Sequence, residues 1–188
     1  MEGNKSTFIM DDIVFSAKMV CDNPLNSERK FNIRFGLQSD WVKIWEIATP
    51  GFREGFFYKS QYEREKKKPR FDNIHLGAEL CINGVKFLLI DAPEPTLSLM
   101  ESMPNLFPSS DLFLISEKLS AEIKKEAVLE IFTKHDISGC GRIPIGQAKK
   151  IIIENTKSLN QQEIETILRR YRFFSTQLFC YSDFISLF

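Results

Sequence analysis

The spacing of apolar residues changes near Ser116, and this change most constrains how the chain can fold. Before Ser116, short apolar runs alternate with polar residues and are separated by turn signals, which is typical of β-strands. After it, apolar residues recur at intervals of three and four, which is typical of amphipathic helices. A block of strands followed by a block of helices predicts an α+β chain, with a β module before an all-α module.

Two hairpins are the clearest β features. Residues 30–37 (KFNIRFGL) alternate so that every second side chain is apolar, and residues 41–47 (WVKIWEI) follow as the second arm. Asn83-Gly84 separates the apolar runs 78–82 and 85–90, and both turn residues tolerate positive φ. We therefore predict hairpins at both places.

Shorter signals complete the β module. Residues 13–20 and 56–58 are further apolar runs that predict strands. We expect a short helix over residues 96–103, with Thr96 as its cap. Residues 104–116 contain two prolines and three serines, and we predict that they form a linker.

The all-α module repeats a helix–loop–helix pattern. Residues 119–134, 145–156 and 161–171 each carry apolar residues at helical spacing, which predicts three helices. Asn160 and Glu163 stand three residues apart, as in a capping box.

The first loop of this module, residues 136–147 (DISGCGRIPIGQ), has the skeleton of a calcium-binding EF-hand loop. Such a loop needs oxygen ligands at positions 1, 3, 5, 7 and 12, and a glycine at position 6 for its sharp turn. Gly141 takes position 6. The ligand positions fall, in order, on Asp136, Ser138, Cys140, Arg142 and Gln147.

The ligand chemistry of this loop is degenerate. Gln147 supplies one neutral oxygen where a bidentate carboxylate belongs, and Cys140 offers a soft sulfur to a hard cation. In the second loop, with Asp183 at position 12, an arginine and a phenylalanine stand where carboxylates belong. We therefore expect no calcium binding and no other cofactor. The position-8 residues, Ile143 and Phe179, are expected to pair in a short shared ladder.

Composition excludes several classes of protein. The formal net charge is zero, which argues against nucleic acid as the main partner. The four cysteines show no metal-ligand spacing, and we expect free thiols of a reducing compartment. The first residues lack a basic region followed by an apolar run, so we expect no secretory signal, and no stretch has the length of a membrane span. We expect an intracellular, soluble protein with no membrane partner.

A basic run is the candidate partner-binding segment. Residues 64–70 (REKKKPR) carry five cations and one acid. A solvated loop is the simplest interpretation. The alternative is contact with an acidic surface through Lys66, Lys67, Lys68 and Arg70, helped by exposed aromatic residues near residues 52–58.

Residues 71–101 resemble the signature of the DM-ten domain. The resemblance rests on an acid before an apolar-glycine pair, a strand, a glycine turn, a second strand and an Asp-x-x-x-x-Thr motif. The residues that carry it are Asp72, Leu76, Gly77, Leu80, Ile82, Gly84, Phe87, Asp91 and Thr96. A DM-ten domain followed by an EF-hand region resembles the myoclonin-like, EF-hand-containing ciliary proteins.

This resemblance implies a fold and a function. It implies a pleckstrin-homology-like β-barrel over residues 8–103, the linker over 104–116 and a degenerate EF-hand pair over 117–188. It also implies a structural protein of the ciliary or flagellar axoneme, in the cytoskeleton of the cytoplasm. There it would be a microtubule inner protein that binds tubulin and other inner proteins on the lumenal wall of doublet microtubules.

Two other functions compete with this one. A calcium-linked adaptor, whose EF-hand pair binds a target helix, is the alternative, and the number of calcium ligands separates it from the first. An enzyme has no supporting group of residues, because neither His75 nor His135 has a cysteine or serine partner at a telling spacing. We therefore predict a protein without catalytic activity.

Overall fold

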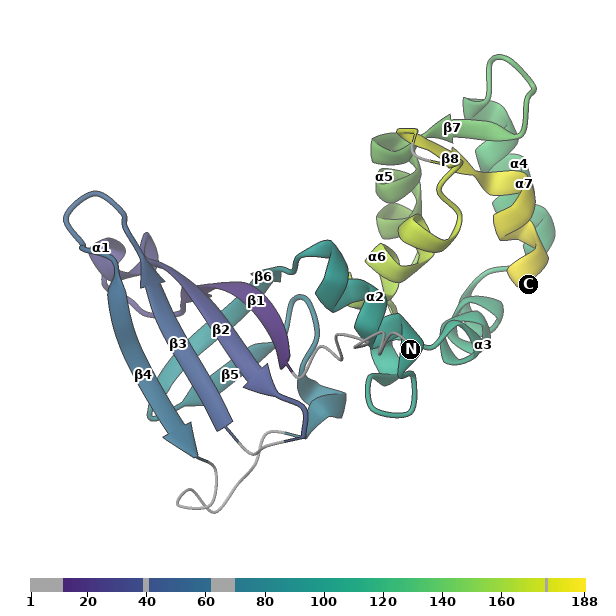
Figure 1. The fold of residues 1–188 in the computed structure, drawn as a ribbon. Coiled ribbons are helices and arrows are strands. Elements are labelled where there is room, and N and C mark those ends of the chain that lie inside the picture. Colours follow the sequence, from purple (N-terminus) through teal and green to yellow (C-terminus); the bar gives the residue numbers. More distant parts are fainter. Residues whose placement is uncertain (1–11, 39–40, 62–69, 175) are drawn as a thin grey trace, which may run out of the picture. The chain divides into compact units, whose positions relative to one another are not determined.

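The structure, a computed structural model, describes residues 12–38, 41–61, 70–174 and 176–188 (Figure 1). The chain divides into two compact units. The first joins the residues up to Ile74 with Ala78–Leu99, and the second joins His75–Gly77 with Met100–Phe188. The first unit is built on an antiparallel sheet and the second on helices, which confirms the predicted α+β class.

A curled, six-stranded antiparallel sheet forms the first unit. Its strand order is β4-β3-β2-β1-β6-β5, so the last hairpin returns to pair with the first strand. The strands are β1 (Asp12–Met19), β2 (Lys30–Gly36), β3 (Trp41–Ile47), β4 (Gly55–Gln61), β5 (Glu79–Ile82) and β6 (Val85–Asp91). Two short helical turns, α1 (Pro24–Ser27) and η2 (Phe71–Asn73), lie in the connections. All the predicted strands are therefore present.

The inner face of this sheet is a phenylalanine-rich core. Phe31 is fully buried and meets the rings of Phe57 and Phe87 at centroid distances of 5.1 and 5.2 Å. Phe57 reaches this core because the pairing of β3 with β4 shifts register between Ile44 and Trp45, which leaves it as the extra residue of a β-bulge.

The Asn83-Gly84 hairpin forms as predicted. The φ angles of Asn83 and Gly84 are 50° and 79°, and β5 pairs with β6 around them. The sign of both angles is what a two-residue hairpin turn requires.

The predicted role of Thr96 is wrong. Helix α2 (Glu94–Ser102) begins two residues earlier than expected, and Thr96 lies fully buried inside it. Its Oγ1 accepts a hydrogen bond from the backbone N–H of Val14, 3.1 Å away. Thr96 therefore ties the helix to β1 instead of capping it.

The second unit contains the two helix–loop–helix segments. Its elements are η3 (Pro108–Ser110), α3 (Leu112–Glu122), α4 (Lys125–His135), β7 (Arg142–Pro144), α5 (Ile145–Asn155), α6 (Gln161–Arg170), β8 (Leu178–Cys180), α7 (Tyr181–Phe184) and η4 (Ile185–Leu187). Their apolar sides share one core. Among the described helices, none is long and apolar enough to cross a membrane.

The single helix predicted over residues 119–134 is wrong. The chain is extended at Ile123 and Lys124, with ψ angles of 141° and 144°, and this break separates α3 from α4. Each helix has its own buried stripe, and the break lets both stripes face the same core.

Residues 104–116, predicted as a linker, contain η3 and the first five residues of α3. Pro108 stands in the first turn of η3, where a proline's missing N–H costs little, so it begins a helical turn. Phe107 and Ile115 are buried in this segment.

Candidate functional site

The loop that follows α4 was predicted as the degenerate ion-binding site, and Asp136 is its centre. Asp136 ends α4 and is only 8% exposed. Its Oδ1 accepts a hydrogen bond from the Ser138 hydroxyl at 2.8 Å, and its Oδ2 accepts one from the backbone N–H of Gly141 at 2.7 Å. Gly141 has a φ of 77°, which confirms the predicted sharp turn.

A third donor comes from the other end of the unit. The Tyr181 hydroxyl, on the first residue of α7, donates to Asp136 Oδ2 at 3.0 Å. Burial alone would raise the pKa of Asp136, but the hydrogen bonds from Ser138, Gly141 and Tyr181 outweigh it and lower the pKa to about 2. The same burial raises the pKa of the Tyr181 hydroxyl, and its bond to Asp136 adds to the effect. Asp136 is therefore an ionised acceptor whose donors come from the protein.

The other predicted ligand positions do not complete a calcium site. The Cys140 thiol contacts the backbone carbonyl of Arg142 at 3.8 Å, and the Arg142 guanidinium lies 3.7 Å from the centre of the Phe173 ring. Gln147 is part of α5 and brings no charge. Calcium affinity depends on the number and charge of oxygen ligands, so this set of residues does not fit the ion. Within the described ranges, no cluster of three or more His, Cys, Asp or Glu side chains could hold a metal.

The two loops are joined by a short ladder. β7 pairs with β8, and Ile143 stands opposite Phe179, which confirms the predicted pairing. Both side chains are buried, and Phe179 stacks on Phe132 with ring centroids 5.8 Å apart. The ladder and the Tyr181–Asp136 bond hold the second loop against the first.

Helix α3 covers apolar surface of the helical unit. Its Ile115 and Leu119 are fully buried in the shared core. Leu119 also lines a cavity of about 20 Å³ together with Phe132 of α4 and Ile152 of α5. A cavity of this size, with mostly apolar walls, is close to a packing defect.

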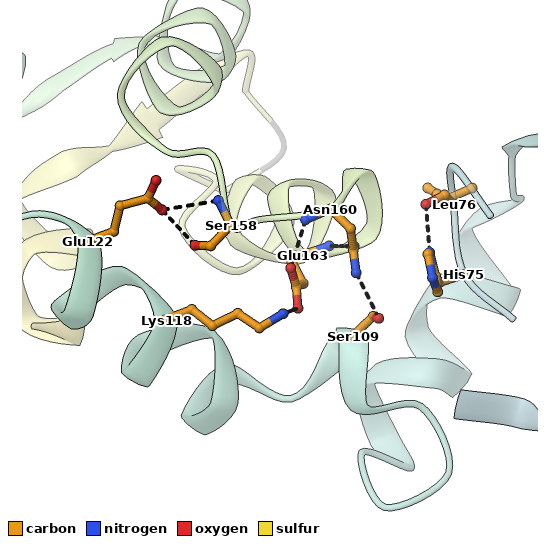
Figure 2. Close-up of polar contacts among 8 residues, drawn as sticks. All are labelled: His75, Leu76, Ser109, Lys118, Glu122, Ser158, Asn160 and Glu163. Atoms are coloured by element: carbon orange, nitrogen blue, oxygen red, sulfur yellow. Dashed lines mark hydrogen bonds and ion pairs between the residues drawn. The ribbon is translucent and has the colours of Figure 1, made fainter. Parts of the chain in front are cut away.

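Polar contacts fix α3 in place (Figure 2). Lys118 Nζ donates to Glu163 Oε1 at 2.6 Å, and the Glu122 carboxylate accepts from both the backbone N–H and the hydroxyl of Ser158. Asn160 caps α6 and forms the predicted capping box with Glu163. The C-terminal half of α3 is thus tied to the first turn of α6 and to the loop that precedes it.

A segment between η2 and β5 also belongs to this unit. The backbone N–H of Leu76 donates to Gln162 Oε1 at 3.3 Å, and Gln162 Nε2 donates to the Ser110 hydroxyl at 3.3 Å. His75 Nδ1 lies 3.0 Å from the backbone oxygen of Leu76, and His135 Nδ1 lies 2.8 Å from that of Ile131 (Figure 2 shows His75). Each histidine therefore contacts the backbone oxygen of a residue close to it in the chain.

The predicted partner-binding residues are only partly visible. Lys66, Lys67 and Lys68 lie outside the described residues. Arg70 is exposed, and its Nε lies 3.2 Å from Asp72 Oδ2. Of the aromatic residues expected near it, Phe56 is exposed, whereas Phe52 lies under the Arg29 guanidinium.

Tyr181 is the residue that the sequence analysis missed. It lies 45 residues after Asp136, and nothing in the local pattern shows that a phenol completes the loop. The only signal was the predicted pairing of Ile143 with Phe179, because that ladder carries the next residues of the second loop towards the first.

Comparison with known protein families identifies the part of the chain that contains the six-stranded sheet. Residues 8–96 match the DM10 domain family. The chain contains a DM10 domain. This result confirms the resemblance that the signature residues predicted, with Asp91 and Thr96 at the end of the match.

Over most of its length, the chain is also similar to proteins described as EF-hand domain-containing family member C2. The Bos taurus protein is 29% identical over 178 residues, which cover 87% of this chain and 24% of the relative. The Danio rerio protein is 28% identical over 187 residues (91% and 25%), and the Gallus gallus protein is 27% identical over 186 residues (91% and 25%). The chain therefore spans about a quarter of the length of the curated relatives it matches.

Proposed function

We propose that the chain is a non-enzymatic structural protein of the ciliary and flagellar axoneme. In this proposal it is a microtubule inner protein, which binds tubulin and neighbouring inner proteins on the lumenal wall of doublet microtubules. The DM10 domain and the similarity to EF-hand domain-containing family member C2 proteins support a place among such proteins. The DM10 domain would be the pleckstrin-homology-like module, and the helical unit a degenerate EF-hand pair.

The observation that carries the proposal is the state of Asp136. In an ion-binding loop this carboxylate would be an open ligand. Here it accepts hydrogen bonds from Ser138, Gly141 and Tyr181. A loop that is closed by its own donors has no need of calcium to hold its shape. A fixed shape suits a permanent assembly better than a sensor.

The calcium-linked adaptor is less well supported. An adaptor of that kind needs an accessible apolar surface for its target helix. In this unit, α3 buries Ile115 and Leu119 in the core, and Lys118 and Glu122 hold the helix in place. We expect neither calcium nor any nucleic acid or membrane among the partners.

Fractionation of cilia tests the proposal. The tagged chain is expressed in ciliated cells, and axonemes are extracted with detergent and then with high salt, in calcium or in a chelator. We expect the chain to stay with the salt-resistant doublets under both conditions, while a tagged soluble protein of similar size is released. Release with the detergent-soluble matrix would contradict the axonemal role, and release by calcium alone would favour the adaptor.

A further inference from the structure

The outer face of the DM10 sheet carries a row of like charges. The register places Arg34 of β2 opposite Lys43 of β3, and Lys43 opposite Lys59 of β4. A second pair, Lys18 and Lys30, stands opposite each other on β1 and β2. Like charges directly opposite each other destabilise a sheet. The fold thus tolerates a repulsive arrangement on strands that lie side by side (Figure 1).

Exposed aromatic residues lie between these cations. Trp45 and Phe56 stand opposite each other on β3 and β4, with 46% and 57% of their surfaces exposed. Their rings pack edge to face with centroids 6.2 Å apart, and Lys43 Nζ lies 4.2 Å from the centre of the Trp41 ring. Large apolar side chains surrounded by charge are typical anchors of protein interfaces.

Little negative charge balances this face. Asp12 Oδ2 lies 3.5 Å from Arg34 Nε, but the Arg34 side chain remains 56% exposed. The acid of β3, Glu46, points to the opposite face, where it is paired with Arg29 at 2.6 Å. The charged residues on the outer face of β2, β3 and β4 are all cations: Lys30, Arg34, Lys43 and Lys59. In a chain of net charge zero, this face is a local basic surface.

We propose that this outer face binds an acidic polypeptide surface. Neighbouring strands lie about 4.8 Å apart, so the row of three cations covers roughly 10 Å. Acidic residues one helical turn apart lie about 5–6 Å from each other and can meet successive cations of the row. Trp45 and Phe56 would bury their exposed edges against the apolar parts of the same partner.

A polypeptide fits this face better than a nucleic acid. Binding to a phosphate backbone rests on a strong basic excess over the domain, and this chain has none. The inference deepens the proposed function, since it rests on a docking role and names the chemistry of the docked surface. Its test uses purified components, so it can fail or succeed whatever the fractionation of cilia shows.

Tryptophan fluorescence gives a direct binding assay. The chain has two tryptophans, and both Trp41 and Trp45 lie on β3. Titration of the whole chain with poly-L-glutamate at low ionic strength should change their emission and saturate. The variant Lys43→Glu/Lys59→Glu should bind at least about tenfold more weakly, because its new carboxylates repel those of poly-L-glutamate. The control Lys124→Glu/Lys125→Glu, with the same change in net charge at the start of α4, should retain wild-type affinity.

Stability supplies a second readout. Lys43→Glu turns the repulsive row into an alternating one, so the unfolding temperature should rise by about 1–4 °C while poly-L-glutamate binding falls. A fall in unfolding temperature would overturn the inference that the row is kept at a cost to stability. The binding inference fails if poly-L-glutamate does not bind, if the control loses as much affinity, or if poly-uridylate or anionic vesicles bind more tightly.

Discussion

Asp136 shows how a single side chain can close from within a loop that the sequence predicts as a degenerate ion-binding loop. Burial opposes its charge, and three donors from Ser138, Gly141 and Tyr181 restore the balance in favour of the carboxylate. Two of these donors belong to the loop itself, and the third belongs to the segment that leaves the second loop. The charge that would bind a cation is thus used to hold the two loops together.

The low pKa of Asp136 predicts an acid-sensitive fold. Its folded pKa of about 2 lies below the ordinary value of 3.8, so its stabilising contribution is present above about pH 4 and is lost as the pH falls towards 2. Tyr181→Phe removes one donor and brings the folded pKa closer to the unfolded one. We expect a lower unfolding temperature at pH 7, by circular dichroism, and a shallower loss between pH 4 and 2.

A matched phenol provides the control for this experiment. Tyr171→Phe removes a hydroxyl from a ring that packs on Phe179 and Phe184. Its acid profile between pH 4 and 2 should follow that of the wild type. If Tyr181→Phe also keeps the wild-type profile, the hydrogen bond to Asp136 does not set this pH dependence.

Arg29 and Glu46 form a largely buried ion pair in the DM10 sheet. Arg29 donates to both oxygens of Glu46 at 2.6 and 2.8 Å, and its guanidinium lies 4.6 Å from the centre of the Phe52 ring. The hydrogen bond to Glu46 raises the pKa of Arg29. Because both side chains are largely buried, Arg29→Met should lower the free energy of unfolding by about 3 kcal/mol, as it leaves a buried carboxylate unpaired.

A double substitution separates the ion pair from its packing. In Arg29→Met/Glu46→Leu the buried charge is gone, so most of the stability should return in urea unfolding. Equal losses in the single and double variants would mean that stacking of the guanidinium on the rings matters more than the ion pair.

At the scale of elements, α3 is the part whose role differs most from a simple connection. It buries one side in the helical core and exposes the other, so two substitutions can test it. Leu119→Ala should lower the free energy of unfolding by about 3 kcal/mol, because it removes a fully buried side chain next to an existing cavity. Phe113→Ala, on a side chain that is 67% exposed, should change it by less than about 0.5 kcal/mol. If both substitutions changed the free energy of unfolding in urea by similar amounts, α3 would not be packed against the core in this way.

The sequence predicted the elements that depend on local pattern. Alternation located β2 and β3, the Asn83-Gly84 turn located the second hairpin, and Asn160 with Glu163 located the start of α6. In each case the residues that decide the structure lie within a few positions of each other.

What the sequence could not show depends on contacts between distant residues. No proline or glycine marks the break at Ile123. The break arises because α3 and α4 pack against one core. The local pattern predicts Thr96 as a helix cap. Its actual partner, the backbone N–H of Val14, lies 82 residues away and leaves no local signal. The cation row is invisible for the same reason, because only the strand register places Lys59 opposite Lys43.

At the scale of the whole molecule, the two units use their charges differently. The DM10 unit presents cations beside exposed aromatic rings on one face of its sheet, whereas the helical unit uses the charge of Asp136 in internal hydrogen bonds and buries Ile115 and Leu119 of α3 in its core. In the proposals made above, the sheet is the docking module and the helices are a fixed scaffold. Calcium should therefore affect neither unit.

A calcium titration of the whole chain tests this last point. A ligand that binds only the folded state at 100 times its dissociation constant stabilises it by about 2.7 kcal/mol, which calorimetry and thermal unfolding would both detect. We expect no heat at micromolar calcium and the same unfolding temperature in calcium and in a chelator. Cys140→Asp/Gln147→Glu adds two carboxylates to the loop and should gain a calcium-dependent rise in unfolding temperature, since affinity follows ligand charge. Saturable binding by the unaltered chain would mean that calcium can displace Tyr181 from Asp136, and the helical unit would then be a sensor after all.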